Sequence, residues 1–118
     1  MYKLIIAGSR DFNDYKLLES EVHKFLSGKE IGETEIVSGT ARGADQLGEK
    51  LAKEYNLKLT KMPANWNEYG KSAGYRRNAE MAKYSNGCIV FWDGVSRGTK
   101  HMIDLAEREK LELKVVKY

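Results

Sequence analysis

Short apolar runs alternate with segments of helical periodicity along the whole chain, and this alternation restricts the folds open to it. The segments at 2–7, 35–38, 57–62, 88–92 and 111–116 are predicted strands, of which 2–7 is a short apolar run and 88–92 is the most apolar. The segments at about 14–26, 44–55, 75–84 and 98–110 carry apolar residues at helical spacing, and Asn13 or Asp14 can cap the first. This strand–helix alternation predicts an α/β domain with a five-stranded parallel sheet, covered by helices on both faces and joined by right-handed crossovers.

The expected strand order is 3-2-1-4-5, which places the switch point between the first and fourth strands. Ligands of such sheets bind at the carboxyl ends of the strands, next to that point. A length of 118 residues suits one domain spanning 1–118, and the single proline and absence of low-complexity sequence give no sign of a linker. The polar and aromatic stretch 64–73 is predicted to be a loop.

Charge and cysteine content narrow the classes of partner. The formal net charge is +3, from 20 basic and 17 acidic residues, which fits an anionic ligand but lacks the strong basic footprint of DNA-binding proteins. The single cysteine, Cys88, cannot form an internal disulfide, and the first apolar run is too short for a membrane span or a signal peptide. We therefore expect a cytoplasmic protein without membrane or nucleic-acid partners. No motif at metal-ligand spacing is present, so no metal is expected.

Four glycine-marked segments, at 8–10, 38–45, 74–78 and 96–99, follow predicted strands or open predicted helices, and in three of the four arginine stands beside small residues. Glycine lets backbone N–H groups approach an anion, a helix N-terminus adds partial positive charge, and arginine adds a bidentate donor. Because parallel strands gather these segments at one edge, we expect one phosphate-binding site. Its predicted residues are Gly8, Ser9, Arg10, Ser38, Gly39, Thr40, Arg42, Gly43, Asp45, Arg77, Asn78, Gly98 and Thr99.

Several of these side chains admit two interpretations. Asp45 either accepts a ribose hydroxyl or stabilises the first turn of its helix. Asp93 either acts as a base or ribose acceptor, or solvates the turn that follows its strand. Trp66 and Tyr69 either stack on a nucleobase or pack their own loop against the domain. Arg77 is expected to face the phosphates, because adjacent helical residues diverge by about 100° and its neighbour then faces solvent.

The sequence GSR after the first strand, SGTARGAD after the second, WNEYGKSAGYRRNAEM and SRGTKHMI together resemble the SLOG superfamily, named for the Smf/DprA and LOG proteins. The closest match is its small single-domain branch, domain of unknown function 2493, related to YspA/YpsA, and the resemblance covers nearly the whole chain. It implies a Rossmann-like, doubly wound fold that binds nucleotides or their derivatives. The superfamily includes nucleotide-sensing domains, DNA-binding DprA, and LOG enzymes that cleave cytokinin nucleotide monophosphates.

The chain departs from the LOG enzymes at their catalytic motif, PGGxGTxxE. The matching stretch is 94–102, in which Gly98 and Thr99 fit but Met102 stands at the glutamate position. A thioether cannot serve as an acid or base at neutral pH. The resemblance therefore implies phosphate binding, while the catalytic residues are unknown, with Asp93 and Asp45 as the candidates for an acid–base role.

These observations predict a protein that binds a nucleotide or a nucleotide-derived small molecule, such as an ADP-ribose or NAD derivative or a cyclic nucleotide. Its expected role is to sense or sequester that signalling nucleotide, without a cofactor of its own. The alternatives are a nucleotide N-glycoside or phosphate hydrolase related to the LOG enzymes, and DprA-like nucleic-acid binding. Related folds often pair through a helix face, so a homodimer or higher homo-oligomer is a further expectation.

Overall fold

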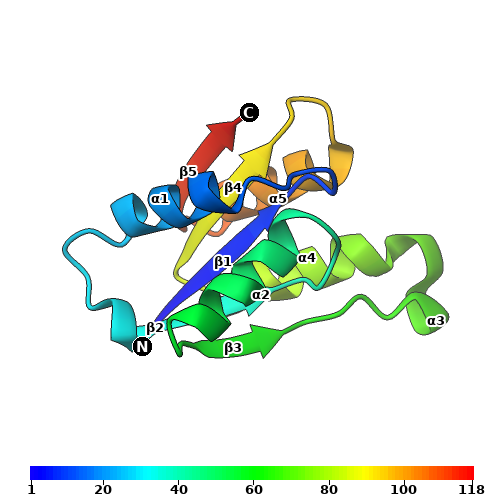
Figure 1. Cartoon of the computed structure of the whole chain (residues 1–118). Helices are drawn as coiled ribbons and strands as arrows, with labels where there is room; N and C mark the ends of the chain where they lie inside the picture. The colour runs from blue at the N-terminus through cyan, green and yellow to red at the C-terminus, as the bar shows by residue number, and fades with distance from the viewer.

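All five strands pair in parallel in the order β3-β2-β1-β4-β5, which confirms the predicted fold class and strand order. The computed structural model describes residues 1–118 (Figure 1). The strands are β1 (Tyr2–Gly8), β2 (Thr34–Ser38), β3 (Lys58–Lys61), β4 (Gly87–Trp92) and β5 (Glu112–Lys117). The longer helices are α1 (Tyr15–Phe25), α2 (Ala44–Glu54), α4 (Ala73–Tyr84) and α5 (Arg97–Arg108).

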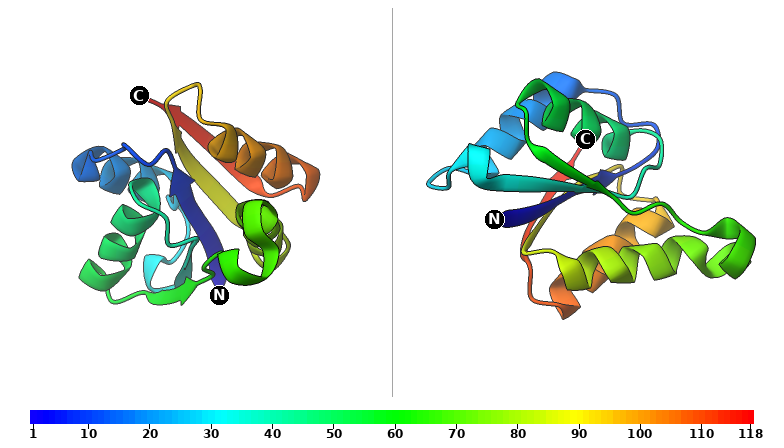
Figure 2. Two further views of the ribbon diagram at one scale, coloured as in Figure 1. Left: turned by 90° about the vertical axis from the view of Figure 1, so that its right-hand side faces the viewer. Right: turned by 90° about the horizontal axis from the view of Figure 1, so that it is seen from below.

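Two helices cover each face of the sheet, as Figure 2 shows. The alternation of side chains along β1 sends Leu4 and Ile6 into the core beneath α1 and α2, and Ile5 and Ala7 into the core beneath α4 and α5. Because the inner strands are buried on both faces, β1 and β4 contain continuous apolar runs, at 4–7 and 88–92, whereas β2 is buried throughout although Thr34, Glu35 and Ser38 are polar. The sheet thus forms a rigid base whose carboxyl edge carries the connecting segments.

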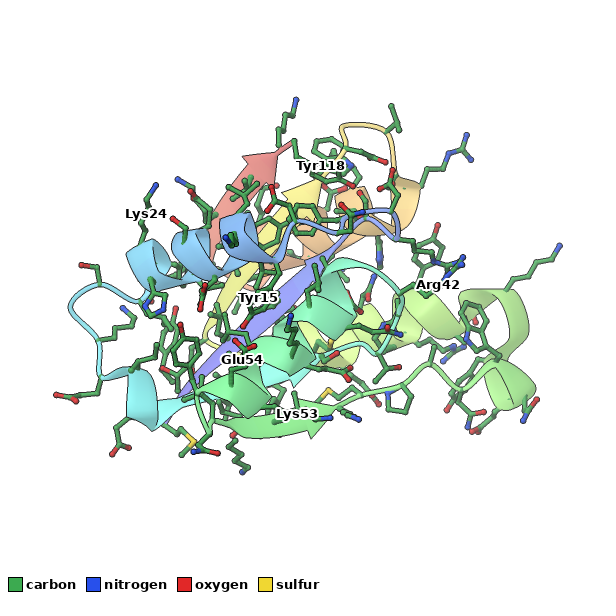
Figure 3. All side chains as sticks on the ribbon, viewed as in Figure 1. Tyr15, Lys24, Arg42, Lys53, Glu54 and Tyr118 are labelled. Carbon is green, nitrogen blue, oxygen red and sulfur yellow. The ribbon has the colours of Figure 1, made fainter.

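The first pair of helices is fixed by one cap and one hydrogen bond between the helices. Asp14 caps α1, its Oδ1 accepting from the Leu17 amide at 3.1 Å, which confirms one of the two predicted caps. The Tyr15 hydroxyl donates to Glu54 Oε2 at 2.6 Å and joins α1 to α2 (Figure 3). No helix combines the length and the apolar character that a membrane crossing needs.

The segment predicted as a loop at 64–73 is largely helical, so that prediction was wrong. It contains a short helix, α3 (Trp66–Tyr69), and a 3₁₀ turn, η2 (Gly70–Ser72), that runs directly into α4. The cause is local, because Asn65 caps α3 by accepting from the Glu68 amide at 3.1 Å. As a consequence Gly74 lies inside a helix rather than at a turn, and Arg77 lies in the second turn of α4.

Candidate functional site

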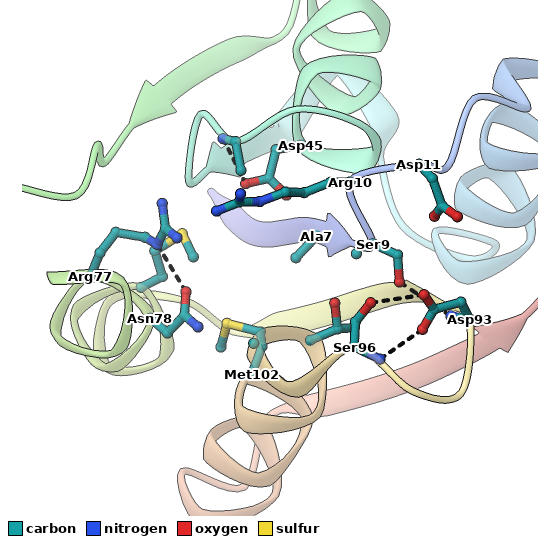
Figure 4. Close-up of a pocket in the computed structure, with 15 residues that line it drawn as sticks. Ala7, Ser9, Arg10, Asp11, Asp45, Arg77, Asn78, Asp93, Ser96 and Met102 are labelled. Carbon is teal, nitrogen blue, oxygen red and sulfur yellow. Dashed lines mark hydrogen bonds between the residues drawn. The ribbon is translucent and has the colours of Figure 1, made fainter. Parts of the chain in front are cut away.

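A cavity of about 390 Å³ opens at the carboxyl edge of the sheet, within the size range of small-molecule sites, about 300–1,000 Å³. It lies between the loops that follow β1, β2 and β4 and the helices α4 and α5 (Figure 4). Nine of the 15 residues that line it are polar or charged. The lining residues are Ala7, Gly8, Ser9, Arg10, Asp11, Ala41, Asp45, Arg77, Asn78, Met81, Asp93, Ser96, Gly98, Thr99 and Met102.

Two glycines allow the backbone segments around this cavity to touch. A Cβ on Gly8 would lie 2.3 Å from the carbonyl oxygen of Phe91, so the ends of β1 and β4 meet only because that side chain is absent. Gly43, which precedes α2, has a φ of +81°, and a Cβ there would lie 2.3 Å from the carbonyl oxygen of Ser9. The turn after β1 is therefore held directly against the start of α2.

Arg10 and Arg77 bring two guanidinium groups to one cavity without a carboxylate partner at salt-bridge distance. Arg77 donates from Nε to Asn78 Oδ1 at 2.9 Å and from Nη1 to the carbonyl oxygen of Gly39, whereas Arg10 is exposed. Burial lowers the pKa of Arg77, nearby Asp45 opposes that change, and the charge of Arg10 adds to it. Two neighbouring like charges in this arrangement favour an anionic ligand.

The N-terminus of α5 points its first amides toward the same cavity. The first backbone hydrogen bond of this helix runs from the Lys100 amide to the Ser96 carbonyl oxygen at 3.1 Å. The amides of residues 97–99 therefore have no acceptor within the helix, and Gly98 and Thr99 line the cavity. Together with the helix dipole, these amides form a suitable anion site beside the two arginines.

Asp93 organises the loop between β4 and α5. Its carboxylate accepts from the Val95 amide at 2.9 Å, the Ser96 amide at 2.8 Å and the Ser96 hydroxyl at 2.8 Å. Its own amide donates to the hydroxyl oxygen of Ser9 at 3.2 Å. Hydrogen bonds from Val95 and Ser96 lower the pKa of Asp93. This carboxylate is thus held ionised by the loop, which favours the turn-stabilising interpretation over an acid–base role.

Asp45 differs from Asp93 because it is buried beside the cavity, with 5% of its surface exposed. Burial raises its pKa to about 6, against the opposing effects of the Ala41 amide, which donates to Oδ2 at 3.2 Å, and of Arg77. Met102 lines the same cavity and is 2% exposed, so a thioether occupies the position given to glutamate in the LOG motif. Asp45 is therefore a carboxyl group of this cavity whose pKa is raised toward neutrality.

The glycine segment after β2 reaches the central cavity only in part. Ser38 is fully buried, donates to Glu49 Oε2 at 2.7 Å and accepts from the Thr40 amide at 3.0 Å, so its hydroxyl fixes the loop and does not line the cavity. Gly43 likewise packs against backbone. Gly39, Thr40 and Arg42 instead line a neighbouring cavity, described below.

Two further cavities adjoin the central one and share Arg10 and Arg77 with it. One, of about 380 Å³, is lined by Gly39, Thr40, Ala41, Arg42, Pro63, Ala64 and Trp66 in addition to the two arginines. The other, of about 220 Å³, is lined by Trp66, Lys71, Gly74, Tyr75, Asn78 and Gly98 in addition to them. Arg10 and Arg77 therefore line all three cavities.

The two predicted stacking residues have different positions. Trp66 lines both side cavities. Tyr69 lines none of the three, and its ring lies beneath the guanidinium of Arg76 at 4.4 Å. Arg76, expected to face solvent, is exposed and donates to the Ser72 hydroxyl at 3.1 Å.

Five residues that line the central cavity were not singled out from the sequence: Ala7, Asp11, Ala41, Met81 and Ser96. Helical spacing could have revealed Met81, since it lies four residues after Arg77 and shares its face of α4. Asp11 follows the predicted site residue Arg10, and Ser96 begins the glycine-marked segment 96–99. Ala7 and Ala41 carry no functional group that a pattern could single out. No group of histidine, cysteine or carboxylate side chains is arranged to hold a metal ion.

Comparison with known proteins places this site in a family context. The sequence model of the YspA, cpYpsA-related SLOG family matches residues 2–69, which extend from β1 to the end of α3. The Gene 61 protein of Mycobacterium phage D29 is 30% identical over 128 residues, covering 100% of this chain and 97% of the phage protein. No solved structure matches the chain significantly.

Proposed function

The chain belongs to the YspA, cpYpsA-related SLOG family, and we propose that it binds a nucleotide or nucleotide-derived small molecule at the carboxyl edge of its sheet. Family membership itself indicates a nucleotide-related function. The observation that carries the proposal is the pair of Arg10 and Arg77, which share one cavity without salt-bridge partners beside the N-terminus of α5. In this proposal a phosphate group of the ligand lies between the two guanidinium groups and the amides at Gly98 and Thr99.

The proposed role is to sense or sequester the ligand. Two features support binding without LOG-type turnover. Met102 cannot donate or accept a proton where the LOG motif has glutamate, and the carboxylate of Asp93 is occupied by its own loop. A small phosphorylated nucleotide, bound and released intact, is thus the proposed partner.

Substitution of Arg10 tests this proposal, because Arg10 is exposed and its loss leaves the core intact. We expect Arg10→Gln to weaken binding of a phosphorylated nucleotide by about tenfold or more. The reason is that a hydrogen bond to a charged group contributes about 1.5–3 kcal/mol, and about 1.4 kcal/mol corresponds to a factor of ten. Calorimetric titration measures the change.

Arg97→Gln is the matched control for this titration. Arg97 is also an exposed arginine, lies at the start of α5 and lines none of the three cavities. The control removes the same charge, so an equal loss of affinity in both variants would mean that general electrostatic attraction, rather than a phosphate site at Arg10, binds the ligand.

Hydrolysis of the nucleotide is a second candidate function, and the protonation of Asp45 favours it. A carboxyl group with a pKa of about 6 inside a ligand-sized cavity can exchange a proton near neutral pH. In this alternative Asp45 protonates the leaving group while water attacks. Product analysis by chromatography distinguishes the two functions, since turnover that is present in the unmodified protein and absent in Asp45→Asn would establish the hydrolase.

A further inference from the structure

Trp66 is an exposed aromatic side chain at the boundary of the candidate site. It begins α3, which lies at the end of the molecule beyond α4 in Figure 1, and 54% of its surface is exposed. Its indole lines both side cavities and pairs with no other aromatic ring. A large apolar ring in this position leaves area available for a ligand.

The indole is held in place from two directions. Asn65 fixes the start of α3, since its Oδ1 accepts from the Glu68 amide and its Nδ2 donates to Glu68 Oε2 at 3.0 Å. On α4, a Cβ built on Gly74 would lie 3.6 Å from Cη2 of Trp66, so the ring approaches the helix where no side chain stands. Positioning by a capped helix and a glycine lowers the entropy lost when a ligand stacks on the ring.

Gly74 lies close to the guanidinium group of Arg77 as well as to the indole of Trp66. A Cβ built on Gly74, which would lie 3.6 Å from the Trp66 ring, would also lie 3.8 Å from Nη2 of Arg77. The aromatic ring and the guanidinium therefore flank one point on α4. A planar base stacked on Trp66 would carry its phosphate groups toward Arg77 and Arg10.

The central cavity shares the two arginines with the side cavities but has a different chemistry. Its lining offers the hydroxyl of Ser9, the carboxyl of Asp45 and the amide of Asn78, all buried, with 2%, 5% and 7% exposed. The Asn78 oxygen already accepts from Arg77, which leaves its Nδ2 group as a donor. Such groups pair with the hydroxyls of a sugar, and the cavity of about 390 Å³ is large enough to admit one.

Resting on the proposed function, we infer that the ligand is a nucleoside diphosphate joined to a sugar, with its base on Trp66. The diphosphate lies between Arg10 and Arg77, and the sugar lies in the central cavity beside Asp45 and Asn78. A nucleoside monophosphate would leave either the aromatic side or the central cavity empty. This order along the site therefore makes Trp66 a specificity-determining residue for the base.

Calorimetric titration of the full chain with ADP-ribose, UDP-glucose, AMP and ribose 5-phosphate tests the inference. The unmodified protein should bind ADP-ribose or UDP-glucose at least tenfold more tightly than AMP or ribose 5-phosphate. Trp66→Ala should weaken binding of the tighter of those two compounds by about 5–150-fold, the range expected for loss of one stacked base, and Trp66→Phe should restore most of the affinity. Binding of ribose 5-phosphate, which has no base, should not change.

Tyr69→Ala is the matched control, because Tyr69 is an exposed aromatic residue of the same helix outside the three cavities. Equal affinity of the unmodified and Trp66→Ala proteins for the sugar-linked diphosphates would overturn the placement of the base. The proposed function would stand in that case if Arg10→Gln still weakened binding. Absence of binding by all four compounds to the unmodified protein would overturn the proposed function and this inference together.

Discussion

Two aspartates in the same cavity show how the surroundings of a carboxyl group determine its use. Asp93 receives three hydrogen bonds from its own loop, and its pKa is lowered. Asp45 receives one from Ala41 and lies in a buried position, and its pKa is raised to about 6. Asp93 is therefore part of the loop structure, while Asp45 is available to a ligand in either protonation state.

The raised pKa of Asp45 predicts a specific dependence of stability on pH. In the unfolded chain this group has a pKa of about 3.8, so between about pH 4 and 6 the folded protein binds more protons than the unfolded chain. The contribution of Asp45 to the free energy of unfolding is greatest below about pH 4 and falls as the pH rises to about 6. The full change is about 3 kcal/mol, at 1.36 kcal/mol for each pKa unit.

Asp45→Asn should remove that fall, since the amide has no proton to lose. Urea denaturation of the unmodified and variant proteins at pH 4 and pH 7 measures the effect. The free energy of unfolding of the variant, relative to the unmodified protein, should be higher at pH 7 than at pH 4 by up to about 3 kcal/mol. A difference that does not change with pH would contradict the account of Asp45.

At the scale of the elements, the contact between the β1 turn and α2 depends on Gly43. The chain offers a matched pair of glycines for measuring that contact. Gly43 and Gly28 both have a positive φ, of +81° and +85°, but only at Gly43 would a Cβ meet another atom. The comparison of the two separates crowding from the conformational cost.

Gly28→Ala should cost only the positive-φ conformation, about 1–2 kcal/mol in the free energy of unfolding. Gly43→Ala should cost that amount plus the clash with the Ser9 carbonyl, typically a further 1–3 kcal/mol. Urea denaturation measures both. Equal destabilisation by the two substitutions would show that the β1 turn does not need its close contact with α2.

The elements were predictable to different degrees. The strands β1 and β4 were predictable because burial on both faces favours continuous apolar runs, and no strand end of the sheet lies more than one residue from its predicted position. The segment 64–73 was predicted wrongly because its polar and aromatic composition is typical of a loop. The start of α3 was nevertheless present in the sequence, as Asn65 followed three residues later by Glu68, a helix-capping pattern.

At the scale of the whole molecule, the parallel sheet follows from the strand–helix alternation, while the composition of the site follows only in part. Parallel pairing brings the ends of β1, β2 and β4 to one edge, so Ser9, Asp45 and Gly98 meet although they are far apart in the chain. Which side chains of a loop turn toward the cavity depends on packing. Ser38 was expected to face the ligand, but its bond to Glu49 turns it into the core.

The most direct test of the central claim, that this edge of the sheet binds a phosphorylated nucleotide, is a depletion measurement. Excess protein is mixed with a panel of nucleotides and their sugar-linked derivatives, and the free fraction and the heat-released fraction are separated by chromatography. The account predicts that one compound leaves the free fraction, is recovered intact after heating, and remains free when Arg10→Gln protein is used. A panel that the unmodified protein leaves in solution to the same extent as Arg10→Gln protein would contradict it.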